Sequence, residues 1–154
     1  MFWVRVDNRL IHGQVIETWL PFAGSKNLLV VNDELASDVI RQEIMGLAVP
    51  SGIEIFFSPV NECVEVVRKK FKNRLSSVFV LFARCSDARQ AFEKGLVFDS
   101  LNIGNIHYGP GKKQVCAHIA LSKDDCSCLN FFSRKGVGLD FRCVPHKHIQ
   151  VDQW

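Results

Sequence analysis

Residues 3–15 read Trp3-Val4-Arg5-Val6-Asp7-Asn8-Arg9-Leu10-Ile11-His12-Gly13-Gln14-Val15, a stretch that joins an apolar strand to the start of an amphipathic helix. The strand is predicted over residues 3–6. Apolar residues at helical spacing then follow as far as Gly24, which indicates a helix that begins at His12-Gly13. A strand that leads directly into a helix is the unit from which α/β folds are built. We therefore expect an α/β fold with His12 at the junction.

The same alternation of strand and helix continues along the chain without a composition break, a repeat or a low-complexity linker. Further strands are predicted at residues 28–31, 53–57, 78–82, 100–103 and 139–143. Because residues 28–31 are all apolar, that strand should be buried on both faces, as in a parallel sheet. The 154 residues should form a single three-layer domain, a mostly parallel, open, twisted sheet with helices on both faces, and about 145–154 should be a short polar tail.

Helices are predicted between these strands, most of them with a recognisable start. Ser58 should cap a helix that Pro59 opens, Ser86 should cap a helix closed by Gly95, and Ser122 should begin a last helix with a capping-box pattern. A further helix should end before Pro50. Its inward face is predicted to comprise Leu35, Val39, Ile40, Ile44, Leu47 and Ala48.

The composition excludes several classes of function. A formal net charge of +3 is too small for a nucleic-acid-binding protein, although it favours an acidic protein partner. The longest apolar stretch, residues 78–83, is far shorter than the roughly 20 residues that span a bilayer, and no signal-peptide pattern precedes the first strand. We expect a soluble, intracellular protein. Its six cysteines form no C-x-x-C pair, so they should be reduced thiols that mostly fill the core.

Candidate site residues cluster in the loops that follow the predicted strands. Ligands of parallel α/β sheets bind at the carboxyl ends of the strands, where these loops lie together. The loop over residues 7–13 carries Asp7, Arg9 and His12, which we predict to be the catalytic residues. The predicted phosphate cradle or partner-binding rim consists of Gly13, Asn32, Asp33, Ser86, Gly104 and His107.

His12 is the predicted nucleophile, because its expected place at a helix start suits phosphate chemistry. Main-chain amides in the first turn of a helix lack intrahelical partners and attract anions. An imidazole that titrates near neutrality can attack phosphorus, and the forked guanidinium of Arg9 can hold phosphoryl oxygens. Asp7 can orient His12 or Arg9 through a hydrogen bond, or it can simply be a turn residue at the end of the strand.

Three motifs together resemble a known family. Residues 6–15 (VDNRLIHGQV), residues 30–34 (VVNDE) and residues 101–104 (LNIG), followed by His107-Tyr108, are similar to the IIB component of the mannose/fructose/sorbose family of bacterial sugar phosphotransferase systems. The resemblance covers nearly the whole chain in the right order and spacing. The chain departs from the family at Asn105, where a second glycine is usual, and in its short tail after Gln150.

The resemblance implies a phosphohistidine carrier. His12 would accept a phosphoryl group from the phosphohistidine of the IIA component and pass it to a sugar held by the membrane IIC and IID components. Arg9 matches the family's phosphate-side arginine. The carrier would be cytoplasmic, held at the inner face of the membrane through its permease partners, and copies of it can associate. The alternative is an orphan regulatory phosphoprotein that reports phosphotransferase status without serving sugar transport.

Other chemistries have weaker support in the sequence. Cys85 lies just before a predicted helix at the same rim, where a thiol pKa can be lowered, so a phosphocysteine at Cys85 is the competing carrier. No glycine pattern for nucleotide phosphates is present. His146 and His148 lack a suitably spaced fourth ligand for a metal. We expect no cofactor and no metal ion.

Overall fold

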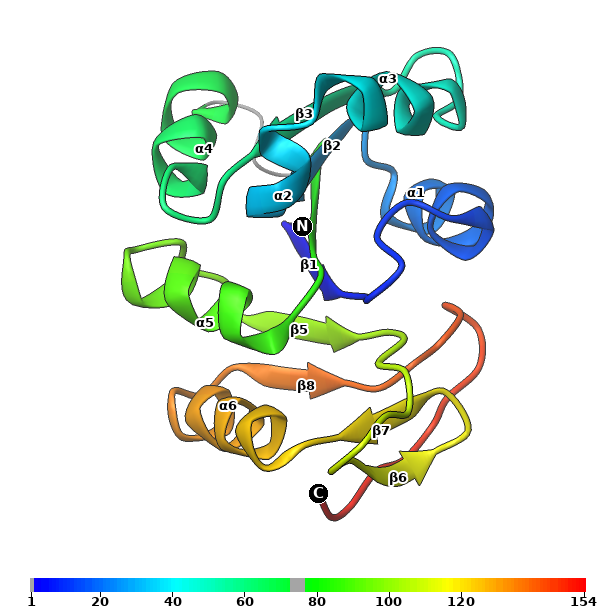
Figure 1. The fold of residues 1–154 in the computed structure, drawn as a ribbon, viewed down its shortest axis with the longest axis vertical. Coiled ribbons are helices and arrows are strands. Elements are labelled where there is room, and N and C mark those ends of the chain that lie inside the picture. Colours follow the sequence, from blue (N-terminus) through cyan, green and yellow to red (C-terminus); the bar gives the residue numbers. More distant parts are fainter. Residues whose placement is uncertain (1, 73–76) are drawn as a thin grey trace.

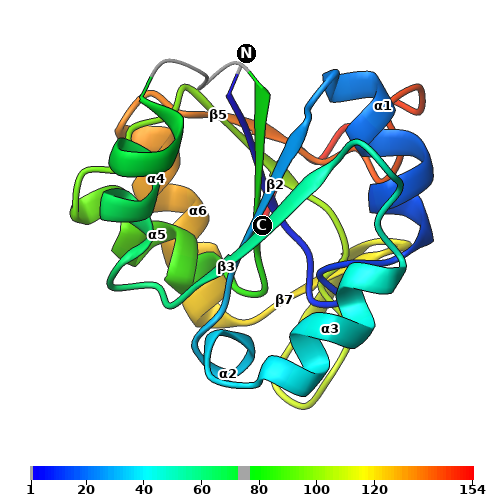
Figure 2. The ribbon, with the colours of Figure 1, turned by 90° about the horizontal axis from the view of Figure 1, so that it is seen from above.

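The computed structural model describes residues 2–72 and 77–154. Within these ranges a six-stranded sheet has the strand order β3-β2-β4-β1-β5-β8, and each neighbouring pair of strands is parallel. The strands are β1 (Trp3–Val6), β2 (Asn27–Val31), β3 (Glu54–Ser58), β4 (Val78–Phe82), β5 (Ser100–Ile103) and β8 (Gly138–Asp140). Helices cover both faces (Figures 1 and 2). The predicted three-layer α/β fold is confirmed.

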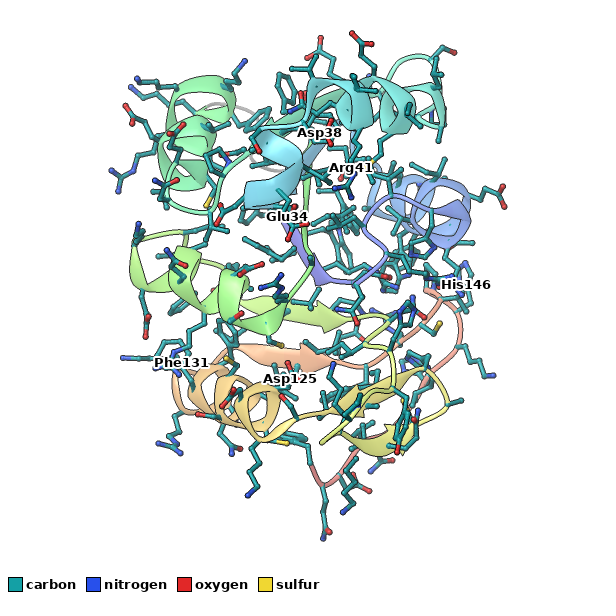
Figure 3. The ribbon with its side chains drawn as sticks, viewed as in Figure 1. Glu34, Asp38, Arg41, Asp125, Phe131 and His146 are labelled. Atoms are coloured by element: carbon teal, nitrogen blue, oxygen red, sulfur yellow. The ribbon has the colours of Figure 1, made fainter. Side chains whose placement is uncertain are left out.

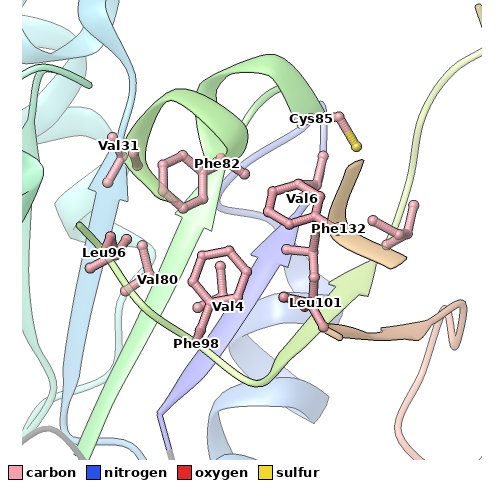
Figure 4. Packing of buried hydrophobic residues seen from close by; sticks show 14 of the residues in the cluster. Val4, Val6, Val31, Val80, Phe82, Cys85, Leu96, Phe98, Leu101 and Phe132 are labelled. Carbon is pink, nitrogen blue, oxygen red and sulfur yellow. The ribbon is translucent and has the colours of Figure 1, made fainter. Parts of the chain in front are cut away.

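The two faces of the sheet carry separate cores. Neighbouring residues of a strand point to opposite faces, so Val4 and Val6 of β1 lie in one core and Trp3 borders the other. The first core packs against α4 (Cys63–Phe71), α5 (Cys85–Glu93) and α6 (Lys123–Arg134), as Figure 4 shows for Phe132 of α6. The second lies under a helix at residues 13–23, α2 (Asp33–Ala36) and α3 (Val39–Leu47). Alternation along β1 thus sets which residues can reach the site.

The helix predicted after the first loop spans residues 13–23 and ends at Gly24, as expected. It comprises the π-helical turn η1 (Val15–Trp19) and the α-helical turn α1 (Leu20–Ala23). Pro21 has no N–H to donate, and the Thr18 hydroxyl donates to the Gln14 carbonyl, so the regular pattern of main-chain bonds is interrupted here. The chain leaves in a left-handed conformation at Gly24, with a φ of 61°.

The inward face predicted for the helix at residues 35–48 was wrong. The segment forms two helices, α2 and α3, and only Leu35 of the predicted face is buried. The exposed fractions of Val39, Ile40, Ile44 and Leu47 are between 61% and 87%, and Ala48 is also exposed. Asp38 caps α3 by accepting a hydrogen bond from the Arg41 amide, which starts a new helix with a different orientation. Met45 and Val49 are the residues that pack inward.

Two of the three predicted serine caps were also wrong. Ser58 ends β3 and donates to the Pro59 carbonyl, and α4 begins only at Cys63 because the Val60 amide is tied to Asp33. Ser86 lies within the first turn of α5, whose N-cap is Arg84. Ser122 does form a capping box with Asp125 at the start of α6. The reciprocal bonds of that box require the Ser-x-x-Asp spacing itself, which the sequence displays directly.

The last part of the chain differs most from the sequence prediction. An antiparallel hairpin of β6 (Lys113–Cys116) and β7 (Ile119–Leu121) was not predicted. Strand β8 stops at Asp140, because the carbonyls of Arg142 and Cys143 accept hydrogen bonds from side chains instead of a neighbouring strand. The tail is not simply polar. Val151 and Trp154 pack against the first core, with the Trp154 ring 5.6 Å from that of Phe141.

Adjacent strands β1 and β4 lead to opposite faces of the sheet. The chain passes from β1 to η1 on one face and from β4 to α5 on the other, so the carboxyl ends of these two strands border a switch point of the topology. Figure 2 shows the two sets of helices on either side of the sheet. Open α/β sheets bind ligands at such points. The fold therefore places the loop that carries His12 at the edge where a site is expected.

Candidate functional site

The loop after β1 is fastened to the loops that follow its two neighbouring strands. The side chain of Asn8 donates to the Ala83 carbonyl after β4 and accepts from the His107 amide after β5, each at 2.8 Å. The Asn8 amide also donates to the Asn105 carbonyl at 2.8 Å. One side chain thus joins three loops that are distant in sequence. These bonds fix the main chain of the His12 loop against the sheet edge.

A tight turn reverses the loop so that His12 faces the end of β1. The Leu10 amide donates to the Asp7 carbonyl at 3.0 Å, and Leu10 has a φ of 54°, which is uncommon for a residue with a side chain. The Leu10 side chain is buried in the second core, which holds this backbone in place. The His12 carbonyl then accepts from the Ile16 amide at 3.1 Å. His12 therefore lies at the junction of the loop and the helix, as predicted, and the helix begins at Gly13.

Asp7 is the buried acceptor at the centre of the site. Its Oδ2 atom accepts from Arg5 Nη2 at 2.8 Å, Asn105 Nδ2 at 2.8 Å and Arg5 Nε at 3.2 Å, and it lies 3.0 Å from His12 Nε2. Its Oδ1 atom accepts from the Arg9 amide at 3.1 Å. Burial by itself raises the pKa of Asp7. The hydrogen bond with His12, the charge of Arg5 and the Asn105 amide outweigh it and lower this pKa to about 2.

The ionised Asp7 decides which nitrogen of His12 is available. A carboxylate only accepts hydrogen bonds, so the proton of the neutral His12 ring must be on Nε2, the nitrogen 3.0 Å from Asp7 Oδ2. The other nitrogen, Nδ1, then keeps its lone pair. The His12 side chain is 13% exposed, so a reacting group can approach it from outside. In this arrangement an ionised carboxylate sets the orientation of a histidine ring.

Arg9 lies beside this pair, and its side chain is partly exposed to solvent. Its side chain is 40% exposed, its Nη2 donates to Gln14 Oε1 at 3.2 Å, and its Nε is 4.0 Å from Asp7 Oδ1. Both predicted partners of Asp7 thus contact it, His12 through its ring and Arg9 mainly through its main chain. A guanidinium held by one weak bond can move to an anion placed at His12.

Arg5 is the residue of the candidate site that the sequence prediction missed. Its side chain is fully buried on the second face of the sheet, over the Trp19 ring, and it pairs with Asp7 and with Asn102. Gly104 makes room for it, since a Cβ at position 104 would come within 2.3 Å of the Arg5 guanidinium. The sequence prediction places Arg5 only in the first strand. An arginine two positions before an aspartate in an otherwise apolar strand was the signal available.

The other predicted rim residues have mainly structural contacts. Asn32 accepts from the Leu35 amide as the cap of α2, Asp33 accepts from the Val60 amide, and Gly104 is buried under Arg5. Ser86 lines a hollow that Asn8 also lines, and Gly13 is the first residue of the helix. His107 is exposed, and its amide bonds to Asn8. The structure therefore brings Asp7, Arg9 and His12 together and places the others around or below them.

The positions of two cysteines differ from what the sequence predicts. Cys85 is fully buried beneath the sheet edge, and this burial raises the pKa of its thiol well above the ordinary value. Cys85 does follow β4 at the predicted rim and borders the hollow that Asn8 and Ser86 line, but its side chain is packed in the first core (Figure 4), which disfavours a reactive thiol there. Cys143, placed in the core by the sequence, instead lies near the site, with its Sγ 3.4 Å from Gln14 Oε1.

A comparison with known proteins gives the family. Residues 1–153 match the family described as the PTS system sorbose subfamily IIB component. The chain belongs to this family. This IIB component is 32% identical to the N-acetylgalactosamine-specific phosphotransferase enzyme IIB component 1 of Escherichia coli over 92% of its own length and 89% of that protein. The resemblance inferred from the three motifs is confirmed.

Two further comparisons place this IIB component among its relatives. The crystal structure of the Escherichia coli N-acetylgalactosamine-specific IIB component 1 superimposes with a TM-score of 0.89, at 31% identity, covering 99% of this chain and 98% of that one. The mannose-specific EIIAB component of Escherichia coli is 29% identical over 91% of this chain, which spans 43% of that longer protein. Among the described residues, no helix is long and apolar enough to cross a membrane.

The lowered pKa of Asp7 predicts a specific dependence of stability on pH. Since the folded pKa lies below the unfolded one, its contribution is complete above about pH 4 and is lost as the pH falls toward 2. The drop from 3.8 to about 2 corresponds to about 2 kcal/mol. We expect the difference in unfolding free energy between the parent and Asp7→Asn to shrink by this amount over that range. Urea titrations at a series of pH values measure it, and a constant difference would contradict the buried ion network.

Gly104 should tolerate no side chain because Arg5 occupies the space. We expect Gly104→Ala to lower the unfolding free energy by about 1–3 kcal/mol, the usual cost of overpacking. Gly109→Ala is the matched control, since no atom lies within 4 Å of a Cβ built there. Thermal and urea unfolding of both variants provide the measurement. Equal stabilities for the two would show that Arg5 is free to move away.

Proposed function

We propose that this protein is a phosphohistidine carrier of a sugar phosphotransferase system. His12 accepts a phosphoryl group from the IIA component and passes it to a sugar bound by the membrane IIC and IID permease during uptake. The protein acts in the cytoplasm, at the inner face of the membrane, through these partners. The observation that carries the proposal is the contact of His12 Nε2 with the buried Asp7 carboxylate at 3.0 Å, which leaves Nδ1 as a nucleophile.

The transfer step is a displacement at phosphorus. The lone pair of His12 Nδ1 forms a new P–N bond while the P–N bond to the donor histidine breaks, and the donor nitrogen keeps the electron pair. No oxidation or reduction occurs. As His12 Nδ1 becomes bonded to phosphorus, the ring becomes more positive, and the Asp7 carboxylate bonded to Nε2–H stabilises that charge.

The surroundings of His12 support a bound phosphoryl group without holding it tightly. Arg9 can exchange its single bond to Gln14 for the phosphoryl oxygens. The amides of Gly13, Gln14 and Val15 precede Ile16, the first donor to a carbonyl of this helix, so they are available to an anion. Transfer between two histidines needs mainly positioning and charge stabilisation. A carrier that must release its group is well served by such moderate contacts.

The name of one relative supports a IIA protein as the partner. The mannose-specific relative is named an EIIAB component, in which a segment matching this chain makes up less than half of the protein. Whether the IIA partner is part of the same protein or a separate one, we expect it to dock at the exposed edge that contains His12. The same donor histidine would then meet His12 Nδ1 from the solvent side. The identity of the sugar depends on the permease rather than on this edge.

We expect a IIA protein of the same sugar system, charged by phosphoenolpyruvate and the general phosphotransferase proteins, to add one phosphoryl group to this chain. His12→Gln should abolish the label, since it removes the nucleophilic nitrogen. Cys85→Ser is the control and should be labelled fully, because that thiol is buried. Intact-protein mass spectrometry measures both. The label should be lost in mild acid and persist in base, as a phosphoramidate does; acid-stable label that depends on Cys85 would refute the proposal.

Arg9 should support the transition state more than the fold. We expect Arg9→Ala to slow transfer from IIA by about 10- to 100-fold, the range for loss of one charged donor to a developing charge. The melting temperature should change little, because the side chain is 40% exposed. Arg9→Lys keeps the charge without the forked geometry and should recover only part of the rate. An unchanged rate in Arg9→Ala, measured by single-turnover transfer, would remove Arg9 from the mechanism.

A further inference from the structure

Asn105 connects the two halves of the site. It follows β5 and is 7% exposed, and its Nδ2 donates to Asp7 Oδ2 at 2.8 Å and to Gln14 Oε1 at 3.2 Å. An amide nitrogen carries two hydrogens, so these bonds use its full donor capacity. One acceptor is the carboxylate that holds His12. The other is the carboxamide that holds Arg9.

We propose that Asn105 is a positioning residue for phosphoryl transfer, which couples the Asp7–His12 pair to the Gln14–Arg9 pair. The inference rests on the proposed function and deepens it. Asn105 touches neither His12 nor Arg9 through a described hydrogen bond, so it acts through their partners. Its own main chain is fixed, because its carbonyl accepts from the Asn8 amide at 2.8 Å. The side chain therefore reaches Asp7 and Gln14 from a rigid base.

The coupling matters most at the moment when Arg9 leaves Gln14. Gln14 Oε1 accepts from Arg9, from Asn105 and from the thiol of Cys143 at 3.4 Å. When Arg9 moves to an incoming phosphoryl group, the Asn105 bond keeps Gln14 in place for its return. At Asp7, the same amide restrains the carboxylate against rotation, so that Oδ2 stays aligned with His12 Nε2. Removal of the amide loosens both supports together.

Asn27 offers a matched control for Asn105. It is 5% exposed, and its Nδ2 donates to Ser77 Oγ at 3.0 Å and to the Ser77 carbonyl at 3.4 Å. It lies at the first residue of β2, whereas the His12 loop follows the last residue of β1. The two asparagines are thus alike in burial and in donor use but sit at opposite ends of a parallel sheet. A change to alanine removes comparable bonds from each.

The test compares Asn105→Ala with Asn27→Ala in single-turnover transfer from the phosphorylated IIA protein, over a range of IIA concentrations. We expect Asn105→Ala to lower the maximal rate about tenfold, the loss that corresponds to one hydrogen bond to a charged group. The IIA concentration at half-maximal rate should not change, because Asn105 is buried. Asn27→Ala should keep the rate within about twofold even if it melts at a similarly reduced temperature.

A second variant, Asn105→Asp, retains the shape of the side chain and therefore distinguishes positioning from packing. Asn105→Asp cannot donate to Asp7 when ionised, and the two carboxylates then repel each other. The facing titratable and charged groups are the Cys143 thiol, Asp7 and, beyond Asp7, the cations Arg5, His12 and Arg9. Asp7 raises the pKa of the new carboxyl, whereas the three cations lower it. As the pH falls from about 8 to about 5, a growing fraction of this carboxyl gains a proton and can donate again, so the ratio of variant to parent rate should rise.

Two results would overturn the inference. One is a maximal rate for Asn105→Ala within about twofold of the parent; the other is a rate ratio for Asn105→Asp that does not change with pH. If Asn105→Ala does not fold, the pH series on Asn105→Asp decides alone. Failure of the proposed function looks different, because the parent chain itself would then carry no label on His12.

Discussion

The buried carboxylate of Asp7 is the interaction on which the site depends. It directly follows the last residue of β1 and has no exposed side-chain surface, so an isolated charge there would be very costly. Arg5, Asn105 and His12 supply donors to one of its oxygens, and the Arg9 amide supplies one to the other. A charge that is satisfied from so many sides cannot move without breaking several bonds. This rigidity gives His12 a defined ring orientation and a defined free nitrogen.

The sheet supplies the remaining constraints. Arg5 can reach Asp7 because alternate residues of β1 face the same side, and Gly104 leaves the space that the guanidinium fills. Asn8 ties the loop to the ends of β4 and β5. The charged network around Asp7 and the hydrogen bonds of Asn8 both lie at the carboxyl ends of β1 and β4, where the chain passes to opposite faces of the sheet. The candidate site thus arises from strand order together with a few side chains.

Helix α3 shows why an apolar pattern can mislead. Ile40, Ile44 and Leu47 repeat at helical spacing, and such a stripe ordinarily faces a core. In the structure the stripe is exposed, and Met45 and Val49 pack inward instead. Figure 3 shows Asp38 and Arg41 close to each other where the new helix begins. Spacing along the chain fixes which residues share a face of a helix, but the turn at Ser37-Asp38 fixes which way that face points.

The sequence by itself determined the fold class, the strand-to-helix junction at His12 and the family, because these depend on local periodicity and on a motif contiguous along the chain. It also placed Asp7 and Arg9 next to His12, since they are neighbours in one loop. Only the tertiary structure decided the roles of Arg5, Gln14, Asn105 and Cys143, and the inert position of Cys85. These residues meet across distances of up to 138 positions in the sequence. Hydrogen bonds and burial are set by proximity in space, which packing of the strands creates and no local pattern encodes.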